Sequence, residues 1–487
     1  MTDKPTEEPK TSSHDSGISE AFAAFMRTDW ADTELRGLAR SDAAPHHERR
    51  RGSLSHAFGS DTLVIPTGRL KVRNDDCSYD FRPGSDFVWL TGYHESDAVL
   101  VLTPASEGGH HAVLYIHPRS PRDTDEFFRD RDYGELWVGR RPSLSETTSR
   151  LGVETADLAD LEKALSELDP SRTRVLRDYD ARVDSAVKAA DDGLRDNELA
   201  ERLSELRLVK DEWEIAQLRD AIAATVEGFV DVVRAMPADR PFSERLIDGV
   251  FGLRARHDGN TTGYGSIAAT GAHATILHWM HNDGLADPKD MLLLDAGVEN
   301  RHFYTADVTR TMPISGRFSD TQRRVYDLVY QAQQAGIEAV KPGVPFKAAH
   351  DAAQRVLAEG LEAWGILPVT ADESLKDDSG LHRRWTLHGT SHSLGLDVHD
   401  CSHARAEAYT KGDLAAGHVL TVEPGLYFQP DDLTVPEELR GIGVRIEDDI
   451  LVTADGHENL SAALPRTSDE VEAWMADQRA QGPRLPG

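Results

Sequence analysis

The longest regular pattern of apolar positions in the chain predicts a helix over residues 210–236. Apolar side chains recur there at every third or fourth position, as they do on the buried face of a helix. They are Ile215, Leu218, Ile222, Val226, Phe229 and Val233. Pro237 ends the helix, because proline has no N–H to donate and its ring clashes with the preceding turn. Two further helices are predicted over 321–339 and 346–364.

The first half of the chain shows a different pattern, in which short apolar runs are bounded by turn residues. Such runs are typical of strands, and they occur at 62–65, 87–90, 98–103 and 112–117. Helical spacing at 19–40 and 157–168 alternates with them, and Arg49, Arg50 and Arg51 are predicted to lie in a solvated turn. The pattern predicts a mixed α/β domain over 19–207 and a second domain over 208–476, flanked by a disordered tail at 1–18 and a frayed tail at 477–487.

Three strands predicted in the second domain contain acidic residues where the apolar pattern demands burial. Asp295 ends the run MLLLD, Glu423 interrupts HVLTVEPGLYF, and Glu447 interrupts GVRIEDDILV. Asp307 follows in TADVTRT. A single such carboxylate is explained by a surface position or an ion pair, since an unpaired buried charge is costly. Four in one domain predict a cluster, which must share protons or bind cations.

The alternation of side chains along these strands places the polar residues together. Arg445 and Glu447 point to one face of their strand, and Thr421 shares a face with Glu423. Asp307 stands in the same relation to Thr309. Each strand therefore presents polar groups to a common side, as the floor of a site built on a sheet should.

A histidine-rich segment accompanies the acids: His388, His392 and His399 lie within twelve residues. A turn with satisfied histidines is one explanation, and a metal ligand with catalytic neighbours is the other. Four carboxylates balance the charge of two divalent ions, with neutral His392 as a further ligand. Oxygen-rich ligation favours Mn²⁺, Co²⁺, Fe²⁺ or Mg²⁺. Two such ions can activate a shared water, which indicates hydrolysis of an amide or ester.

Composition narrows the alternatives further. The chain has 487 residues and a formal charge of -30, which disfavours binding to nucleic acid or anionic membranes. Only two cysteines are present, which excludes a disulfide framework and predicts a reducing, cytoplasmic location. The first residues contain no apolar stretch typical of a signal peptide, and no segment is apolar enough for a membrane span. The sequence contains no HExxH, GxSxG or GxxxxGK[ST] motif, and Gly263-Tyr-Gly265 does not complete a dinucleotide-binding motif.

These segments, in this order, resemble the metal-dependent pita-bread peptidases, most closely the bacterial Xaa-Pro aminopeptidase (aminopeptidase P) family. The matching segments are SDFVWLTGYHESDAVLVL, ELWVGRR, LLLDAG, ADVTRT, HGTSHSLGLDVHD, LTVEPGLY and GIGVRIEDDILVT. The resemblance covers roughly residues 60–470. It implies a smaller N-terminal α/β domain and a C-terminal pita-bread domain with a curved, mostly antiparallel sheet. It also implies a homodimer or homotetramer, and peptide substrates with proline in second position.

The resemblance also implies roles for individual residues. Asp295, Asp307, His392, Glu423 and Glu447 would be the ligands of a two-manganese centre, whose bridging hydroxide would attack the scissile carbonyl with Glu423 as general base. His278 and His399 would steady the tetrahedral intermediate or the leaving nitrogen, and His388 would line the proline pocket. Arg445, Tyr264 and Tyr427 would hold substrate or ligands, and Asp76 and Trp137 match positions that could wall the site of a neighbouring subunit.

Two alternatives share this resemblance. A prolidase would carry the same metal set but accept only Xaa-Pro dipeptides, and a pita-bread protein without metal, a binding protein or a creatinase-like relative, would have lost ligands. The spacing of Asp295 and Asp307 is 12, one more than is common in the family. We expect the extra residue in the 298–305 turn, since an insertion inside a strand would turn one carboxylate to the wrong face.

Overall fold

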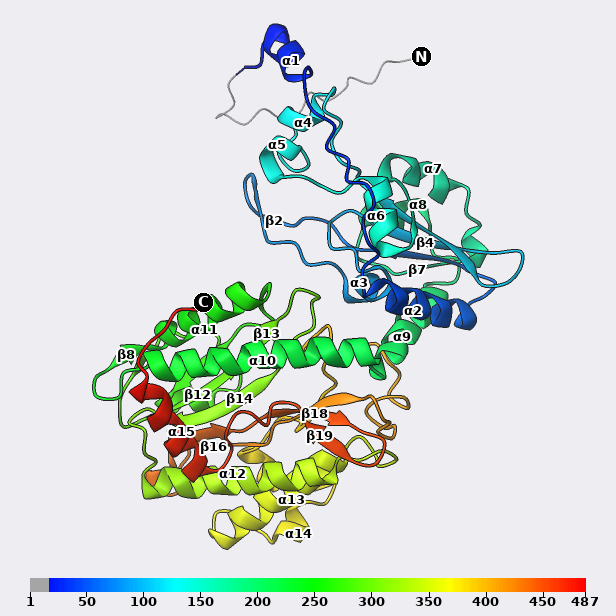
Figure 1. Ribbon diagram of the computed structural model, residues 1–487. Coiled ribbons are helices and arrows are strands. Elements are labelled where there is room, and N and C mark those ends of the chain that lie inside the picture. The colour runs from blue at the N-terminus through cyan, green and yellow to red at the C-terminus, as the bar shows by residue number, and fades with distance from the viewer. Residues whose placement is uncertain (1–16) are drawn as a thin grey trace. The chain divides into compact units, whose positions relative to one another are not determined.

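The computed structural model describes residues 17–487, and the chain divides into two compact units (Figure 1). The first unit ends at Asp192 and the second is Gly193–Gly487. The predicted disordered tail falls largely outside the described residues. The boundary predicted at 207/208 falls before the last residue of α9 (Leu194–Leu208), which precedes α10 (Glu212–Ala235), and it stays a prediction.

The N-terminal unit is built on a five-stranded mixed sheet with the order β6-β5-β4-β1-β7. Its outer pairs are parallel and its inner pairs antiparallel. Val64, Val99 and Val175 pack under Leu161 and Leu165 to form the core of one face. The elements are β1 (Thr62–Pro66), β2 (Val72–Asn74), β3 (Cys77–Ser78), β4 (Val99–Pro104), β5 (His110–Ile116), β6 (Glu154–Asp157), β7 (Thr173–Val175), α1 (Glu20–Met26), α2 (Ala44–Ala57), α3 (Ser85–Thr91), α4 (Glu126–Arg129), α5 (Glu135–Val138), α6 (Leu144–Leu151), α7 (Leu161–Ser166) and α8 (Ala181–Ala186).

Three local predictions for this unit are wrong. Residues 87–90 lie in helix α3, whose side chains are buried throughout, so the run shows no helical periodicity to read. Arg50 and Arg51 are buried on α2 rather than solvated, and they donate to the carbonyl oxygens of Trp89 (3.2 Å) and Leu90 (2.7 Å). These carbonyls lack partners within their own helix because they belong to its last turn. The helix predicted over 19–40 is confined to α1.

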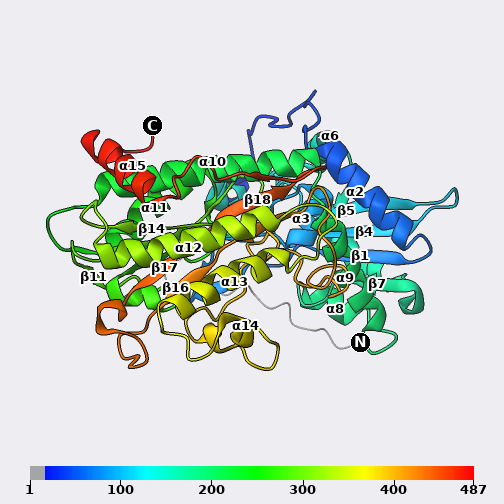
Figure 2. The same ribbon diagram turned by 90° about the horizontal axis from the view of Figure 1, so that it is seen from below.

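Helices cover the strands of the C-terminal unit on two sides. Helices α10 and α11 (Glu244–Asp258) lie along one side of the strands, and α12 (Asp320–Ala339) and α13 (Ala348–Ala363) lie along the other (Figures 1 and 2). The three predicted helices of this unit agree with α10, α12 and α13. The unit also contains α14 (Ala371–Ser374) and α15 (Ser468–Ala480). Because α15 continues to Ala480, residues 477–480 are helical and not frayed as expected.

The strands of this unit form small antiparallel sheets, as expected for the fold class. One has the order β10-β12-β14 and another β15-β18-β19, and β16 pairs with β17. Side chains from β12, β14 and the covering helices make one continuous apolar core. The strands are β8 (Phe242–Ser243), β9 (Thr261–Thr262), β10 (Ile267–Thr270), β11 (Leu285–Ala286), β12 (Met291–Ala296), β13 (Val298–Glu299), β14 (Val308–Pro313), β15 (Val419–Val422), β16 (Gly425–Tyr427), β17 (Gly443–Arg445), β18 (Asp448–Val452) and β19 (His457–Asn459).

Two of the strands predicted as continuous are interrupted where their acidic residues stand. Val422 of β15 pairs with Asp448 of β18, and Gly425 of β16 pairs with Arg445 of β17. Glu423 and Glu447 therefore lie at the same break in the ladder, where Pro424 cannot donate a strand hydrogen bond. The break frees both carboxylates from the sheet and turns them toward one place.

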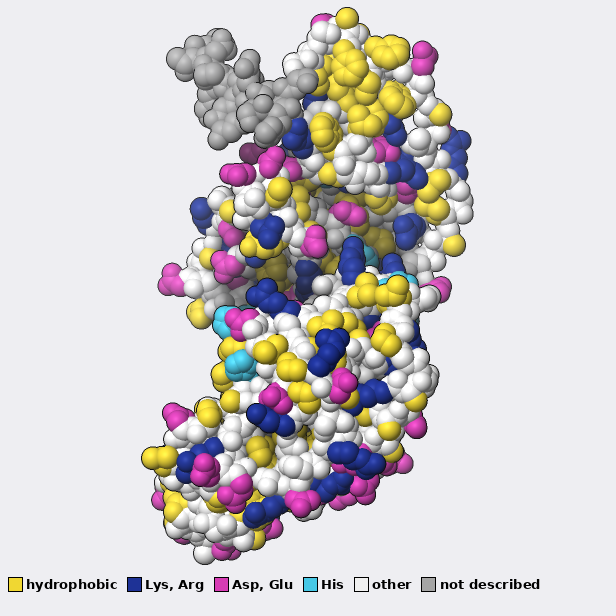
Figure 3. Space-filling view, turned by 90° about the vertical axis from the view of Figure 1, so that its left-hand side faces the viewer, with side chains coloured by type: hydrophobic (Ala, Val, Ile, Leu, Met, Phe, Trp, Pro, Cys, Tyr) yellow, Lys and Arg dark blue, Asp and Glu magenta, His cyan; other side chains and the backbone are white. Residues whose placement is uncertain are grey.

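The surface of the molecule mixes charges of both signs. On the face that Figure 3 draws, Lys and Arg side chains alternate with Asp and Glu, and hydrophobic side chains gather at the end that carries α1 and α5. Phe25 of α1 is 75% exposed and Trp137 of α5 is 51% exposed. Within the described residues, no helix combines the length and the apolar character that crossing a membrane requires.

The fold also predicts a pH dependence of stability through His418. Burial and the nearby Lys210 ammonium lower the pKa of His418 to about 4, from an ordinary value of 6.5. Between these two values the unfolded chain binds a proton that the folded chain does not, so the free energy of unfolding falls as the pH falls. We expect wild type to lose about 1–2 kcal/mol more than His418→Gln between pH 7 and pH 4.5 in urea denaturation. Equal losses in the two proteins would contradict this.

Candidate metal centre

A cavity of 480 Å³ in the C-terminal unit brings the predicted site residues together. It is lined by all five predicted metal ligands, Asp295, Asp307, His392, Glu423 and Glu447. The same cavity is lined by Tyr264, His278, His388, His399 and Arg445, together with apolar Ile267, Leu277, Met280 and Val398. Residues separated by more than 150 positions in the sequence therefore line the same cavity.

Three of the predicted ligands form a tight group. One donor atom each from Asp307, His392 and Glu447 lies within 4.8 Å of the other two. His392 Nε2 is 3.3 Å from Asp307 Oδ2 and 3.4 Å from Glu423 Oε1. These distances leave the donor atoms near enough to share a cation.

The antiparallel pair of β12 and β14 sets the position of the two aspartates. The register runs unbroken from Met291 opposite Pro313 to Ala296 opposite Val308. Asp295 pairs with Thr309, and Asp307 stands just before β14. Because neither strand contains a bulge, the additional residue between the aspartates lies in the connecting loop, as expected.

Three backbone segments, at Gly263, Gly297 and 305–306, cross closely beside the cavity. This crossing places Tyr264 against Asp295 and Asp307. Gly263 N donates to Gly297 O (2.9 Å), and a Cβ at Gly297 would lie 1.7 Å from Ala306 O. A Cβ at Gly263 would lie 1.8 Å from Thr305 Oγ1. The Tyr264 hydroxyl consequently reaches Asp295 Oδ1 (2.7 Å) and Asp307 Oδ1 (2.5 Å). Its predicted part in substrate binding stays a prediction.

Arg445 links the carboxylates to a tyrosine behind them. Its guanidinium contacts Asp295 Oδ2 (2.5 Å) and donates to the Tyr427 hydroxyl (3.0 Å) and to Thr309 Oγ1 (3.2 Å). The Thr309 hydroxyl in turn donates to Glu447 Oε2 (2.7 Å). Arg445 is buried, so this ion pair is shielded from solvent and fixes the orientation of Asp295.

The acids of the cavity repel one another. Burial and the charge of Asp307 raise the pKa of Glu423 to about 7 and that of Glu447 well above its ordinary value. Burial also raises the pKa of Asp295, although Arg445 opposes it. Burial lowers the pKa of His392, but Asp307 and Glu423 outweigh this and raise it to about 9. Four carboxylates that oppose one another's ionisation, together with one imidazole, fit divalent cations.

The histidine segment is fixed by the strand beside it. His392 N donates to Thr421 Oγ1 (3.2 Å), and Thr421 N donates to His392 O (3.0 Å). His399 packs edge-on against His392 with ring centroids 4.4 Å apart. His388 Nε2 is 2.7 Å from the Tyr427 hydroxyl, and its Nδ1 is 3.6 Å from Glu423 Oε2. The segment thus presents three imidazoles in the cavity.

Two predicted residues lie in the other unit. Asp76 is exposed on the β2–β3 hairpin with its carboxylate 3.8 Å from Arg131, and the Arg131 guanidinium lies over the Trp137 ring at 4.8 Å. Trp137 Nε1 donates to Phe128 O (2.7 Å). Asp76 and Trp137 therefore share one arginine, and their predicted part in walling a site stays a prediction.

Two residues that the sequence pattern did not single out contact the site from behind. Asp449 is fully buried, and its Oδ2 accepts from the N–H of Asp307 (3.2 Å). Glu244 is fully buried beneath the loop that carries His278. Asp449 stands two residues after Glu447 and directly before the apolar run 450–452, which was the available signal, whereas Glu244 looks like an ordinary acid in the first turn of a helix.

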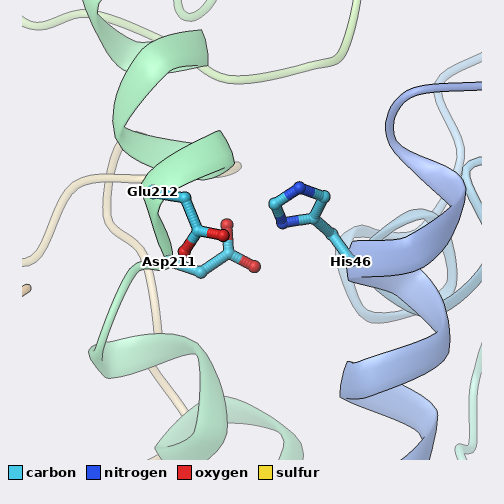
Figure 4. A group of neighbouring side chains, drawn as sticks. All are labelled: His46, Asp211 and Glu212. Atoms are coloured by element: carbon cyan, nitrogen blue, oxygen red, sulfur yellow. The ribbon is translucent and has the colours of Figure 1, made fainter.

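Asp211 and Glu212 stand at the start of α10, and Figure 4 draws them together with His46 of α2. The Asp211 side chain accepts from the N–H groups of Trp213 and Glu214 (both 3.0 Å), and Glu214 accepts from Asp211 N (3.0 Å). These contacts form a capping box, which explains Asp211 as the residue that begins the long helix. His46 belongs to the other unit, and we assign no site to this group.

Comparisons with known proteins match both units. Residues 216–454 match the model of metallopeptidase family M24, and residues 46–176 match the aminopeptidase P N-terminal domain. Xaa-Pro aminopeptidase 1 of Streptomyces coelicolor is 52% identical over 475 residues, covering 98% of this chain and 96% of that protein. Xaa-Pro aminopeptidase of Escherichia coli is 34% identical over 460 residues, which cover 89% of this chain and 98% of that protein. The structure of Escherichia coli aminopeptidase P with the inhibitor Pro-Leu superposes with a TM-score of 0.80 at 30% identity, covering 91% of this chain and 100% of that one.

Proposed function

This chain belongs to metallopeptidase family M24, and on that premise we propose how its cavity performs the cleavage for which its relatives are named. It is a metal-dependent hydrolase that releases the first residue of a peptide whose second residue is proline. The observation that most strongly supports this function is that one cavity is lined by all five predicted ligands, Asp295, Asp307, His392, Glu423 and Glu447.

The proposal also includes the number and the kind of metal ions in the cavity. We infer two divalent ions per chain, because four buried carboxylates with one arginine partner carry more negative charge than one ion neutralises. The oxygen-rich donor set favours Mn²⁺. Bound there, the ions would lower the pKa of a water and polarise the scissile carbonyl.

Glu423 is the group best placed to move a proton. Its carboxylate lines the cavity beside the other proposed ligands, where it would accept a proton from a metal-held water and return it. This return is necessary because the leaving nitrogen of any peptide bond must gain a proton, and the nitrogen of proline carries no hydrogen in the peptide. His388 Nδ1 is 3.6 Å from Glu423 Oε2, which supports the predicted place of His388 in the proline pocket.

The remaining polar groups hold the substrate. His278 and His399 line the cavity and would donate N–H groups to the oxygen of the tetrahedral intermediate. Burial and the charge of Arg445 lower the pKa of His388 to about 4, so its imidazole is neutral and keeps its contact with the Tyr427 hydroxyl. The apolar side chains of Ile267, Leu277 and Val398 provide surface for the proline ring.

A comparison of peptide lengths tests this function against a prolidase. We expect the enzyme, loaded with Mn²⁺, to cleave Xaa-Pro-Yaa-Zaa at least tenfold faster than the dipeptide Xaa-Pro, measured as kcat/KM. A peptide with alanine in place of proline is the control and should be cleaved far more slowly. Activity confined to the dipeptide would favour the prolidase alternative.

We further propose that the chain associates with itself as a dimer or tetramer. The exposed side chains of Phe25, Trp137 and their neighbours on α1 and α5 support this, because monomers rarely expose such groups together. Light scattering on wild type and on Trp137→Ser measures the oligomeric state. We expect the oligomer of the variant to dissociate at a higher protein concentration than the wild-type oligomer. An identical monomer mass for both proteins would contradict the proposal.

The free state of both cysteines supports the proposed cytoplasmic location. Cys77 is exposed and Cys401 is buried, and neither forms a disulfide. An exposed thiol is best preserved in a reducing compartment.

A further inference from the structure

The loop that carries His278 is held by one buried carboxylate. Glu244 stands at the first position of α11 and has no exposed surface. Its Oε1 accepts from the Thr270 N–H (2.8 Å), the Thr270 hydroxyl (2.7 Å) and His273 Nδ1 (2.9 Å). Its Oε2 accepts from Trp279 Nε1 (2.8 Å) and the Gly284 N–H (2.7 Å). All five donors belong to residues 270–284, which form this loop and its two ends.

Only an ionised carboxylate satisfies this arrangement. Both oxygens face donors, so neither can carry a proton or be replaced by an NH₂ group without losing contacts. Burial raises the pKa of Glu244, but the hydrogen bonds from Trp279, His273 and Thr270 outweigh it and lower the pKa below its ordinary value. The N-terminal end of α11 adds favourable positive potential for the same charge.

The imidazole of His278 depends on this support. Within the part of the chain that the structure describes, no hydrogen bond holds the His278 side chain, although it lines the cavity. Its neighbour Trp279 is fixed on both sides, by its bond to Glu244 and by stacking on His273 at 3.9 Å. Leu277, on the other side of His278, packs on the small apolar cluster that includes Tyr427. The backbone on either side therefore sets where His278 points.

We propose that Glu244 is a positioning residue for the cleavage reaction, which holds the 270–284 loop so that His278 faces the scissile bond. The proposal rests on the proposed function of His278. A catalytic group displaced by about 1 Å can cost about 100-fold in rate. Glu244 thus acts on turnover through the loop and touches neither substrate nor metal.

The test replaces Glu244 by glutamine in the full-length, Mn²⁺-loaded enzyme. We expect kcat to fall about 10- to 100-fold with KM changed less than threefold. In a His278→Ala background the same change should have no further effect on kcat, because the group being positioned is gone. An equal loss of kcat in both backgrounds would overturn the proposal.

A second readout does not depend on activity. Amide hydrogen exchange of residues 271–284 should accelerate at least tenfold in Glu244→Gln, whereas exchange in β12 and β14 should be unchanged. If wild type were to cleave no Xaa-Pro peptide, the proposed function would fail, yet this measurement would still show whether Glu244 holds the loop. Unchanged exchange in the loop would overturn the proposal directly.

Matched variants separate positioning from general stability. Glu472→Gln removes a buried carboxylate of the same unit that accepts from Phe318 N and from Arg317 and Arg323, and it should leave kcat and loop exchange unchanged. If Glu244→Gln does not fold, Trp279→Phe removes one of the five donors and should lower kcat several-fold. Wild-type kcat and wild-type loop exchange in that variant would reject the proposal.

Discussion

Replacing Glu423 by glutamine is expected to abolish measurable turnover while leaving the fold intact. The substitution keeps the shape of the side chain, and the backbone bond from Glu423 N to Thr390 O (2.9 Å) is unaffected. By the proposed roles of Glu423, it would remove both the charge of a metal ligand and the proton acceptor of the cavity. Loss of the acceptor alone costs about 10²–10⁴-fold in rate. The measurement is kcat/KM on an Xaa-Pro peptide, together with metal content and a thermal melt.

The control for this variant is Glu458→Gln. Glu458 is a half-exposed glutamate of β19 paired with Arg219, in the same unit but outside the cavity. We expect its kcat/KM to equal that of wild type within a factor of two. A Glu423→Gln enzyme that retained more than a tenth of the wild-type rate would exclude Glu423 as the proton acceptor.

Removing the metal is expected to lower the melting temperature by about 5–10 °C. Ligands that bind only the folded state at a hundred times their Kd stabilise it by about 2.7 kcal/mol, and each kcal/mol shifts a unit of this size by about 2–4 °C. Without metal ions, the positive charges that compensate the carboxylates of the cavity, among residues 17–487, are Arg445 and a protonated His392. Calorimetry with and without EDTA, followed by Mn²⁺ readdition, measures the effect.

The variant Glu447→Gln gives this experiment an internal check. In EDTA it should melt above metal-free wild type, because folding of the wild type must either protonate this buried carboxyl or keep its charge among like charges, whereas glutamine is neutral. Adding Mn²⁺ should stabilise it less than wild type, because a donor is missing. A wild-type melting temperature that is the same with and without EDTA would contradict the metal centre as a whole.

The carboxylates could be found from the sequence because they violate a strong rule. Asp295, Glu423 and Glu447 each interrupt a run of residues that otherwise belongs in a core, and that conflict is visible without a structure. The interruptions of the strands at Glu423 and Glu447 were not predicted, since the apolar pattern continues across both breaks. Pro424 was the available signal for the first break.

Other features left no such conflict in the sequence. The buried run at 87–90 shows neither helical nor strand periodicity, because every side chain of α3 faces protein, and its length alone favoured the wrong element. Glu244 opens a helix, where an acid is expected, so the five donors it gathers from 270–284 could be known only from the tertiary structure. Local sequence rules describe the neighbours of a residue along the chain, whereas the donors to Glu244 lie 26 to 40 positions away in the sequence.

The backbone crossing at Gly263 and Gly297 sets a limit on how this enzyme can be altered. A methyl group at either position would collide with Thr305 or Ala306, and the shift needed to relieve it would draw Tyr264 away from Asp295 and Asp307. In a saturation library selected for growth on proline-containing peptides, both positions should therefore tolerate glycine alone. The two glycines would then be as invariant in the selected library as the acidic residues of the cavity, although neither supplies an atom to the reaction.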